Sequence, residues 1–108
     1  MPAHEKLNGL QFQYDTPDLG ESKPVHRIIA MHGANQMGTM LWDSKQIRNI
    51  GTTPGQERRG VATGMWNEGH RLAAENAKIP APKHSADRTA AGDDWAKAVG
   101  GKLPRRRR

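Results

Sequence analysis

The sequence contains no cysteine, few aromatic residues and no long apolar run. The absence of cysteine excludes disulfide bridges and thiolate sites, whether metal-binding or nucleophilic. No segment approaches the roughly 20 apolar residues that a membrane-spanning helix needs. The first nine residues are polar and do not resemble a secretory signal. We therefore expect a protein that is neither secreted nor bound in a membrane.

The low content of apolar residues limits the core of this 108-residue chain. Hydrophobic residues make up 34% of the chain, a small share for a domain of this size. We expect the three tryptophans to pack in the core, with Trp66 and Trp95 both buried. A core this lean predicts a protein assembly, either a virion or a homo-oligomer, that supplies further burial.

The basic charge is concentrated at the C-terminus. The formal net charge is +6, and without the run of four terminal arginines it is +2. We therefore divide the chain into a domain over residues 1–104 and a basic tail over residues 105–108. The tail, Arg105, Arg106, Arg107 and Arg108, is either a solubilising end or a contact for an anionic partner. An acidic protein surface is favoured over weak, non-specific nucleic-acid contact, because the nearly balanced domain offers no continuing basic track.

The order of periodic segments predicts an α+β fold. Alternating or β-branched runs bounded by turn residues indicate strands, and apolar residues at helical spacing indicate helices. Prolines end the first helix, whereas Thr89 and Gly100 suit the N-cap and C-cap of the second. The first expected helix begins at Val61, and the second ends at Val99. The expected strands are Leu10–Tyr14, Val25–Met31, Met37–Trp42, Ile47–Thr53 and a proline-bearing segment Ile79–Lys83.

The segment from Ile47 to Ala77 organises the chain. It predicts a strand, a basic turn with Gly60, and a helix in which Val61, Met65 and Leu72 share one face. Such a turn directs unpaired backbone N–H groups and the positive end of a helix towards one point, which suits a phosphate. A turn without any ligand is the alternative interpretation.

The turn resembles the pyrophosphate-binding signature of the GNAT superfamily of N-acetyltransferases. Gly60 and Ala62 match the two small positions of that signature, and Arg58 and Arg59 match its basic pair. Glu57 departs from the Gln or Arg that the family prefers. The resemblance extends over about residues 10–103 and implies a reduced GNAT-like fold, with a mixed sheet of about five strands and two helices.

The resemblance implies an acyl-CoA-binding, N-acetyltransferase-like protein with acetyl-CoA as cofactor. The turn would hold the pyrophosphate, and the preceding strand would pair with the pantetheine arm. The implied cofactor-binding residues are Ile50, Gly51, Thr52, Arg58, Arg59, Gly60, Val61 and Ala62.

The resemblance leaves the catalytic residues unassigned. The position of the family's usual tyrosine holds Ala96, and the only tyrosine is Tyr14. Glu68 and His70 are candidate bases by their chemistry alone, and a solvated helix face is their more ordinary role. The histidines show no metal-ligand spacing, so we expect no metal.

The C-terminal part is similar to small proteins of this type encoded by bacteriophages of actinobacteria. The shared mark is the pattern HSxxRTxxGDxW, which begins at His84 and ends at Trp95. This similarity implies a location in the host cytoplasm or in the virion. It also raises a second hypothesis, a non-catalytic virion structural protein, such as a minor capsid protein or a head–tail or tail adaptor, that reuses the fold.

Overall fold

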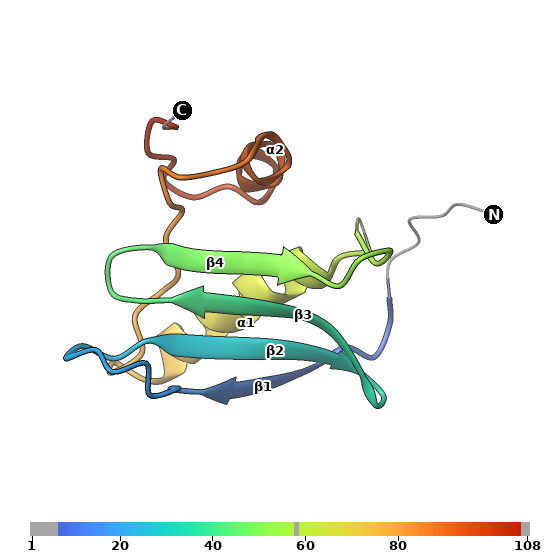
Figure 1. The fold of residues 1–108 in the computed structure, drawn as a ribbon, viewed down its shortest axis with the longest axis horizontal. Helices are drawn as coiled ribbons and strands as arrows, with labels where there is room; N and C mark the ends of the chain where they lie inside the picture. The colour runs from blue at the N-terminus through green and yellow to red at the C-terminus, as the bar shows by residue number, and fades with distance from the viewer. Residues whose placement is uncertain (1–6, 58, 107–108) are drawn as a thin grey trace.

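The sheet and helices follow the order expected from the sequence. The computed structural model describes residues 7–57 and 59–106, which form an α+β fold with a four-stranded antiparallel sheet and two helices (Figure 1). The strands lie in the sheet in chain order, β1-β2-β3-β4. The elements are β1 (Gln11–Asp15), β2 (His26–His32), β3 (Asn35–Trp42), β4 (Ile47–Thr52), α1 (Val61–Glu75) and α2 (Ala90–Val99). Neither helix in the described part of the chain is long and apolar enough to cross a membrane.

The prediction of a fifth strand and a mixed sheet is wrong. Residues 79–83, all described, form no strand and run beside the start of β4. Pro80 and Pro82 have no amide hydrogen to donate to a strand ladder. The segment instead offers carbonyl groups: the Ile47 amide donates to Lys83 O at 2.7 Å, and Trp42 Nε1 donates to Pro80 O at 2.7 Å. The sheet is therefore antiparallel throughout its four strands.

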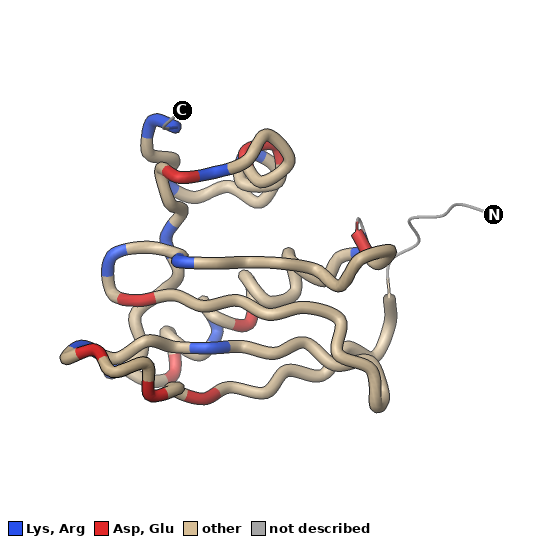
Figure 2. Tube along the Cα trace, viewed as in Figure 1, with Lys and Arg blue, Asp and Glu red and all other residues tan. Residues whose placement is uncertain are grey.

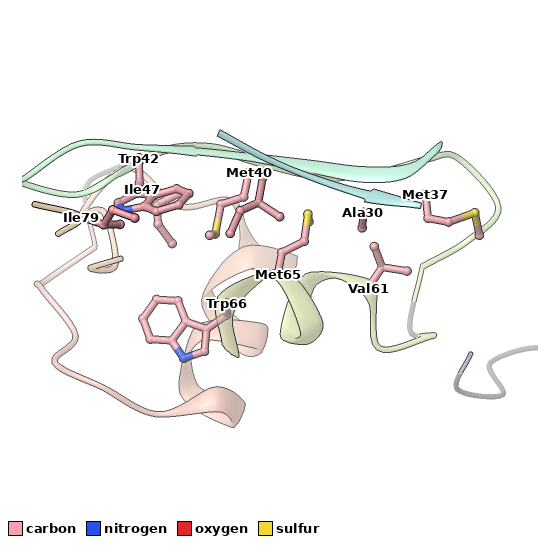
Figure 3. Close-up of a cluster of buried hydrophobic side chains, with 10 residues drawn as sticks. Ala30, Met37, Met40, Trp42, Ile47, Val61, Met65, Trp66 and Ile79 are labelled. Atoms are coloured by element: carbon pink, nitrogen blue, oxygen red, sulfur yellow. The ribbon is translucent and has the colours of Figure 1, made fainter. Parts of the chain in front are cut away.

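The core lies between one face of the sheet and α1 (Figure 3). The strand register places Ile28 opposite Met40 and Met40 opposite Ile50, so apolar side chains line up across the strands. From the helix, Met65 points towards this row, whereas the ring of Trp66 lies to one side of it (Figure 3), against His84 and Trp95. Full burial of an aliphatic side chain such as Ile28 contributes about 1.5–3 kcal/mol to the stability of the fold.

Small residues let α1 approach the sheet closely. A Cβ atom at Gly38 would lie 2.8 Å from Gly51 O and 2.9 Å from Val61 Cγ1. A Cβ atom at Gly69 would lie 2.5 Å from Cγ of Pro82. Any side chain at either position would push the helix away from its neighbours.

The second helix lies beyond the edge strand β4, on the side where the chain ends (Figure 1). Its predicted caps are confirmed: Thr89 Oγ1 accepts a hydrogen bond from the Gly92 amide at 3.0 Å, and Gly100 ends the helix with a φ of 85°. Trp66 is buried as predicted, with 7% of its surface exposed. The predicted burial of Trp95 is wrong, because α2 leaves one side of its indole open and the residue is half-buried.

Candidate functional site

A cleft of about 560 Å³ lies between the edge strand β4 and the two helices. Its volume falls within the 300–1,000 Å³ that is usual for small-molecule sites. One wall is the end of β4, the floor is the turn with the first residues of α1, and the other wall is α2. The lining residues are Ile50, Gly51, Thr52, Glu57, Gly60, Val61, Ala62, Thr63, Thr89, Ala91, Gly92, Asp94 and Trp95.

The structure brings six of the eight expected cofactor residues to this one cleft. They come from two segments, Ile50–Thr52 and Gly60–Ala62. Arg59 is not among the lining residues: its Nη1 donates to Gln56 Oε1 at 2.7 Å, and its carbonyl accepts from Leu7. Arg58 lies outside the described residues.

The N-terminus of α1 opens towards the cleft. Gly60 is its N-cap and adopts the left-handed conformation, with φ 85° and ψ 7°, which other residues adopt only with strain. Within the described residues, no side chain caps this helix end and its first turn carries no acidic residue. The first N–H groups of α1 therefore remain available to an acceptor, next to the positive end of the helix dipole.

The edge of β4 presents backbone hydrogen-bonding groups to the same cleft. The Thr53 amide donates to Met37 O at 2.8 Å, which fixes the alternation of the antiparallel ladder. Gly51 then faces β3, whereas Ile50 and Thr52 direct their N–H and C=O groups away from it. These groups lie on the free side of the edge strand and can pair with an extended ligand.

The side-chain charge at the cleft is negative. Glu57 and Asp94 line it, and no lysine or arginine is among the described lining residues. Figure 2 shows basic residues at the C-terminal end of the chain, beside α2, and basic and acidic residues together at the end of the sheet where β3 turns into β4. Attraction for an anion in the cleft must therefore come from the helix end and its backbone amides.

A second hollow, of about 180 Å³, continues the cleft along β4. It shares Ile50, Thr89, Gly92 and Trp95 with the larger cleft and extends towards Ile47. Together the two hollows form a groove along the edge strand.

The candidate catalytic residues lie away from the cleft. Ala96 is fully buried and does not line it. Tyr14 is on β1, at the opposite edge of the sheet, with its hydroxyl 2.7 Å from His26 Nδ1. Glu68 is paired with Arg71 on the outside of α1. His70 packs against the Trp66 ring, with centroids 4.5 Å apart, and burial lowers its pKa.

Sequence reasoning missed Asp94, an exposed carboxylate on the α2 wall of the cleft. No pattern in the sequence singles it out, because Asp93 and Asp94 are adjacent and only the docking of α2 separates their roles. Asp93 is bonded to Lys97 and Arg88, which lower its pKa. No group of three or more potential metal ligands occurs within residues 7–57 and 59–106.

The HSxxRTxxGDxW pattern fastens α2 to α1. His84 stacks on Trp66 with ring centroids 4.2 Å apart, and Trp95 meets Trp66 edge-on at 5.7 Å. Thr89 caps α2, and Arg88 bonds to Asp93. Comparisons of the chain with protein-family models, with curated proteins and with solved structures found no match. The site is therefore interpreted from its own geometry.

Proposed function

We propose that the cleft binds the pyrophosphate and pantetheine arm of an acyl-CoA, and that the protein is an N-acetyltransferase-like domain with a reduced GNAT-like fold. The observation that carries this proposal is the meeting of two segments: Ile50–Thr52 and Gly60–Ala62 line one cleft. A helix end suited to a phosphate thus lies next to a free strand edge suited to an amide-bearing chain.

The chemistry of the ligand matches this arrangement. The pyrophosphate would accept hydrogen bonds from the first N–H groups of α1, after Gly60. The pantetheine arm carries two amide groups, which would pair with the outward backbone groups of Ile50 and Thr52. Its chain has about as many backbone atoms as four extended residues, which span about 13 Å along a strand. The acyl end would then lie where the cleft joins the second hollow, beside Ile50 and Trp95.

Acyl transfer to an amine also requires a base near the thioester. Asp94 is the carboxylate on the wall of the cleft that could accept the proton of an acceptor amine. Asp94→Asn should therefore remove any acetylation of amines by the protein while leaving the binding of CoA within about twofold.

Calorimetry with CoA tests the proposal. We expect a Kd in the micromolar range, which corresponds to a binding free energy of about −8 kcal/mol. Gly60→Asp should abolish binding, because the side chain adds bulk and negative charge at the helix end. Glu57→Gln should strengthen binding by removing a repulsive carboxylate.

A matched control separates the site from general damage to the fold. Gly55 also has a positive φ, 87°, and no atom lies within 4 Å of a Cβ placed there. Gly55→Asp introduces the same charge and the same backbone strain outside the lining of the cleft, so binding should persist. Absence of binding by the unaltered protein at millimolar CoA would contradict the proposal.

The second candidate is a non-catalytic virion structural protein that reuses the fold. It is favoured by the position of Tyr14, the only tyrosine, at the far edge of the sheet from the cleft. The partner would then be another protein of the assembly, contacted through the tail. This candidate expects no CoA binding and a defect in assembly when residues 105–108 are deleted.

A further inference from the structure

The α2 wall of the cleft is attached less firmly than α1. Of the ten residues of α2, all described, Ala96 is the one that is buried. In α1, by contrast, the core takes up Val61, Met65, Trp66 and Gly69. Because segments with little buried surface open at a lower free energy than the core, α2 should open locally while the sheet stays folded.

Two aromatic contacts hold the middle and the end of α2. Trp95 Nε1 donates to Thr63 Oγ1 at 3.2 Å, which joins α2 to the first turn of α1. His84, stacked on Trp66, bonds through Nε2 to Gly100 O at 2.7 Å. The start of α2 has no such aromatic contact in the described structure and depends on an arginine.

Arg88 connects three segments through one guanidinium group. Its Nε donates to Asp93 Oδ1 at 3.0 Å, in the first turn of α2. Its Nη1 donates to Ser85 O, and its Nη2 donates to Pro104 O at 2.8 Å, in the segment that leads to the tail. Only 9% of the Arg88 side chain is exposed, so these hydrogen bonds are shielded from competing water.

The tail also contacts Arg88, through its backbone. Arg106 Nε donates to the carbonyl of Arg88 at 2.8 Å. The backbone and the side chain of Arg88 are thus both held by residues 104–106. The next residue, Thr89, lines the cleft.

We propose that α2 is a movable wall of the cleft and that Arg88, together with Pro104 and the tail residue Arg106, is the latch that holds it closed. The latch regulates access to the site. Its connection to CoA rests on the proposed function, but the latch itself can be measured without any ligand. A partner that takes up Arg106 would release the latch, so tail binding and cleft binding oppose each other to the same degree.

Hydrogen exchange of the full chain, followed by mass spectrometry, tests the latch. Arg88→Ala should raise the exchange rate of the α2 amides at least about tenfold, because it removes charge-assisted hydrogen bonds to three segments. Arg106→Ala should raise it about two- to fivefold, since one bond is lost. Exchange in β2 and β3 should stay at the rate of the unaltered protein.

Arg105→Ala is the matched control, because Arg105 is an exposed neighbour with the same charge and should leave exchange unchanged. If Arg88→Ala unfolds the chain, the α2 exchange rates of Arg88→Lys and Arg106→Ala test the latch instead. Lysine keeps the charge of Arg88 but loses the planar fork that bonds to several groups at once. The proposal is overturned if both variants leave the α2 exchange rates unaltered, or if exchange in β2 and β3 accelerates as much as in α2.

CoA at millimolar concentration should slow α2 exchange. Failure of CoA to bind counts against the proposed function, whereas the Arg88 and Arg106 results judge the latch.

Discussion

Replacing Gly69 by alanine should destabilise the fold, although alanine is the better helix former. The new Cβ would lie 2.5 Å from Pro82 Cγ and 3.2 Å from Met40 Cε. Pro82 is fully buried and its ring is rigid, so it cannot move aside as a flexible side chain would. Overpacking costs about 1–3 kcal/mol, and the gain in helix propensity offsets about 1 kcal/mol of that. A Cβ atom 2.5 Å from a rigid ring is a severe overlap, so the overpacking cost should lie in the upper half of that range. We therefore expect a net loss of about 1–2 kcal/mol from the free energy of unfolding.

Gly64→Ala is the matched control in the same helix. There the new Cβ would lie 3.0 Å from Phe12 Cζ. Phe12 is half-buried on the edge strand β1, so its ring can shift by a few tenths of an ångström. The higher helix propensity of alanine should then determine the effect, and the free energy of unfolding should change by between zero and a gain of about 1 kcal/mol.

Urea unfolding followed by tryptophan fluorescence measures both variants, and thermal unfolding followed by circular dichroism provides a second value. For a domain of this size, 1 kcal/mol corresponds to about 4–8 °C in Tm. The packing argument is refuted if Gly69→Ala is as stable as the unaltered protein, or if Gly64→Ala loses as much stability as Gly69→Ala.

Three further predictions follow from burial and charge. Trp66→Ala should cost about 3–5 kcal/mol in urea unfolding, and Trp95→Ala clearly less, because its indole is only partly buried; equal losses would contradict this packing. Burial lowers the pKa of His26, so the unfolded chain takes up a proton near pH 6.5 more readily than the folded one. Stability should be full above about pH 6.5 and fall below it. His26→Gln should reduce this dependence in unfolding curves measured from pH 5 to 8, and His70, whose pKa is also lowered, accounts for the part that remains. Deleting residues 105–108 should impair assembly if the tail binds protein. If it binds duplex DNA instead, retention should fall with salt with a log–log slope of about −3 to −4, and an unchanged slope after deletion would exclude that contact.

The resemblance to the GNAT superfamily rests on local sequence, whereas the cleft depends on tertiary packing. The small residues of the signature identify a turn before a helix, which is a local feature. That this turn lies beside Ile50–Thr52 follows from the docking of α1 on the sheet, which Gly38 and Gly69 permit. Arg58, Arg107 and Arg108, which belong to the expected sites, lie outside the described residues.

The sequence by itself determined the order and the limits of the elements. The four strands, the start of α1 at Val61 and the caps Thr89 and Gly100 agree with it to within about two residues, because alternation, helical spacing and turn residues act locally. Tertiary structure decided that residues 79–83 stay outside the sheet, that Asp94 faces the cleft and that Arg88 joins α2 to the tail. Periodicity tells which side of an element is apolar, but the distance between two elements depends on how side chains far apart in the chain fill the space between them.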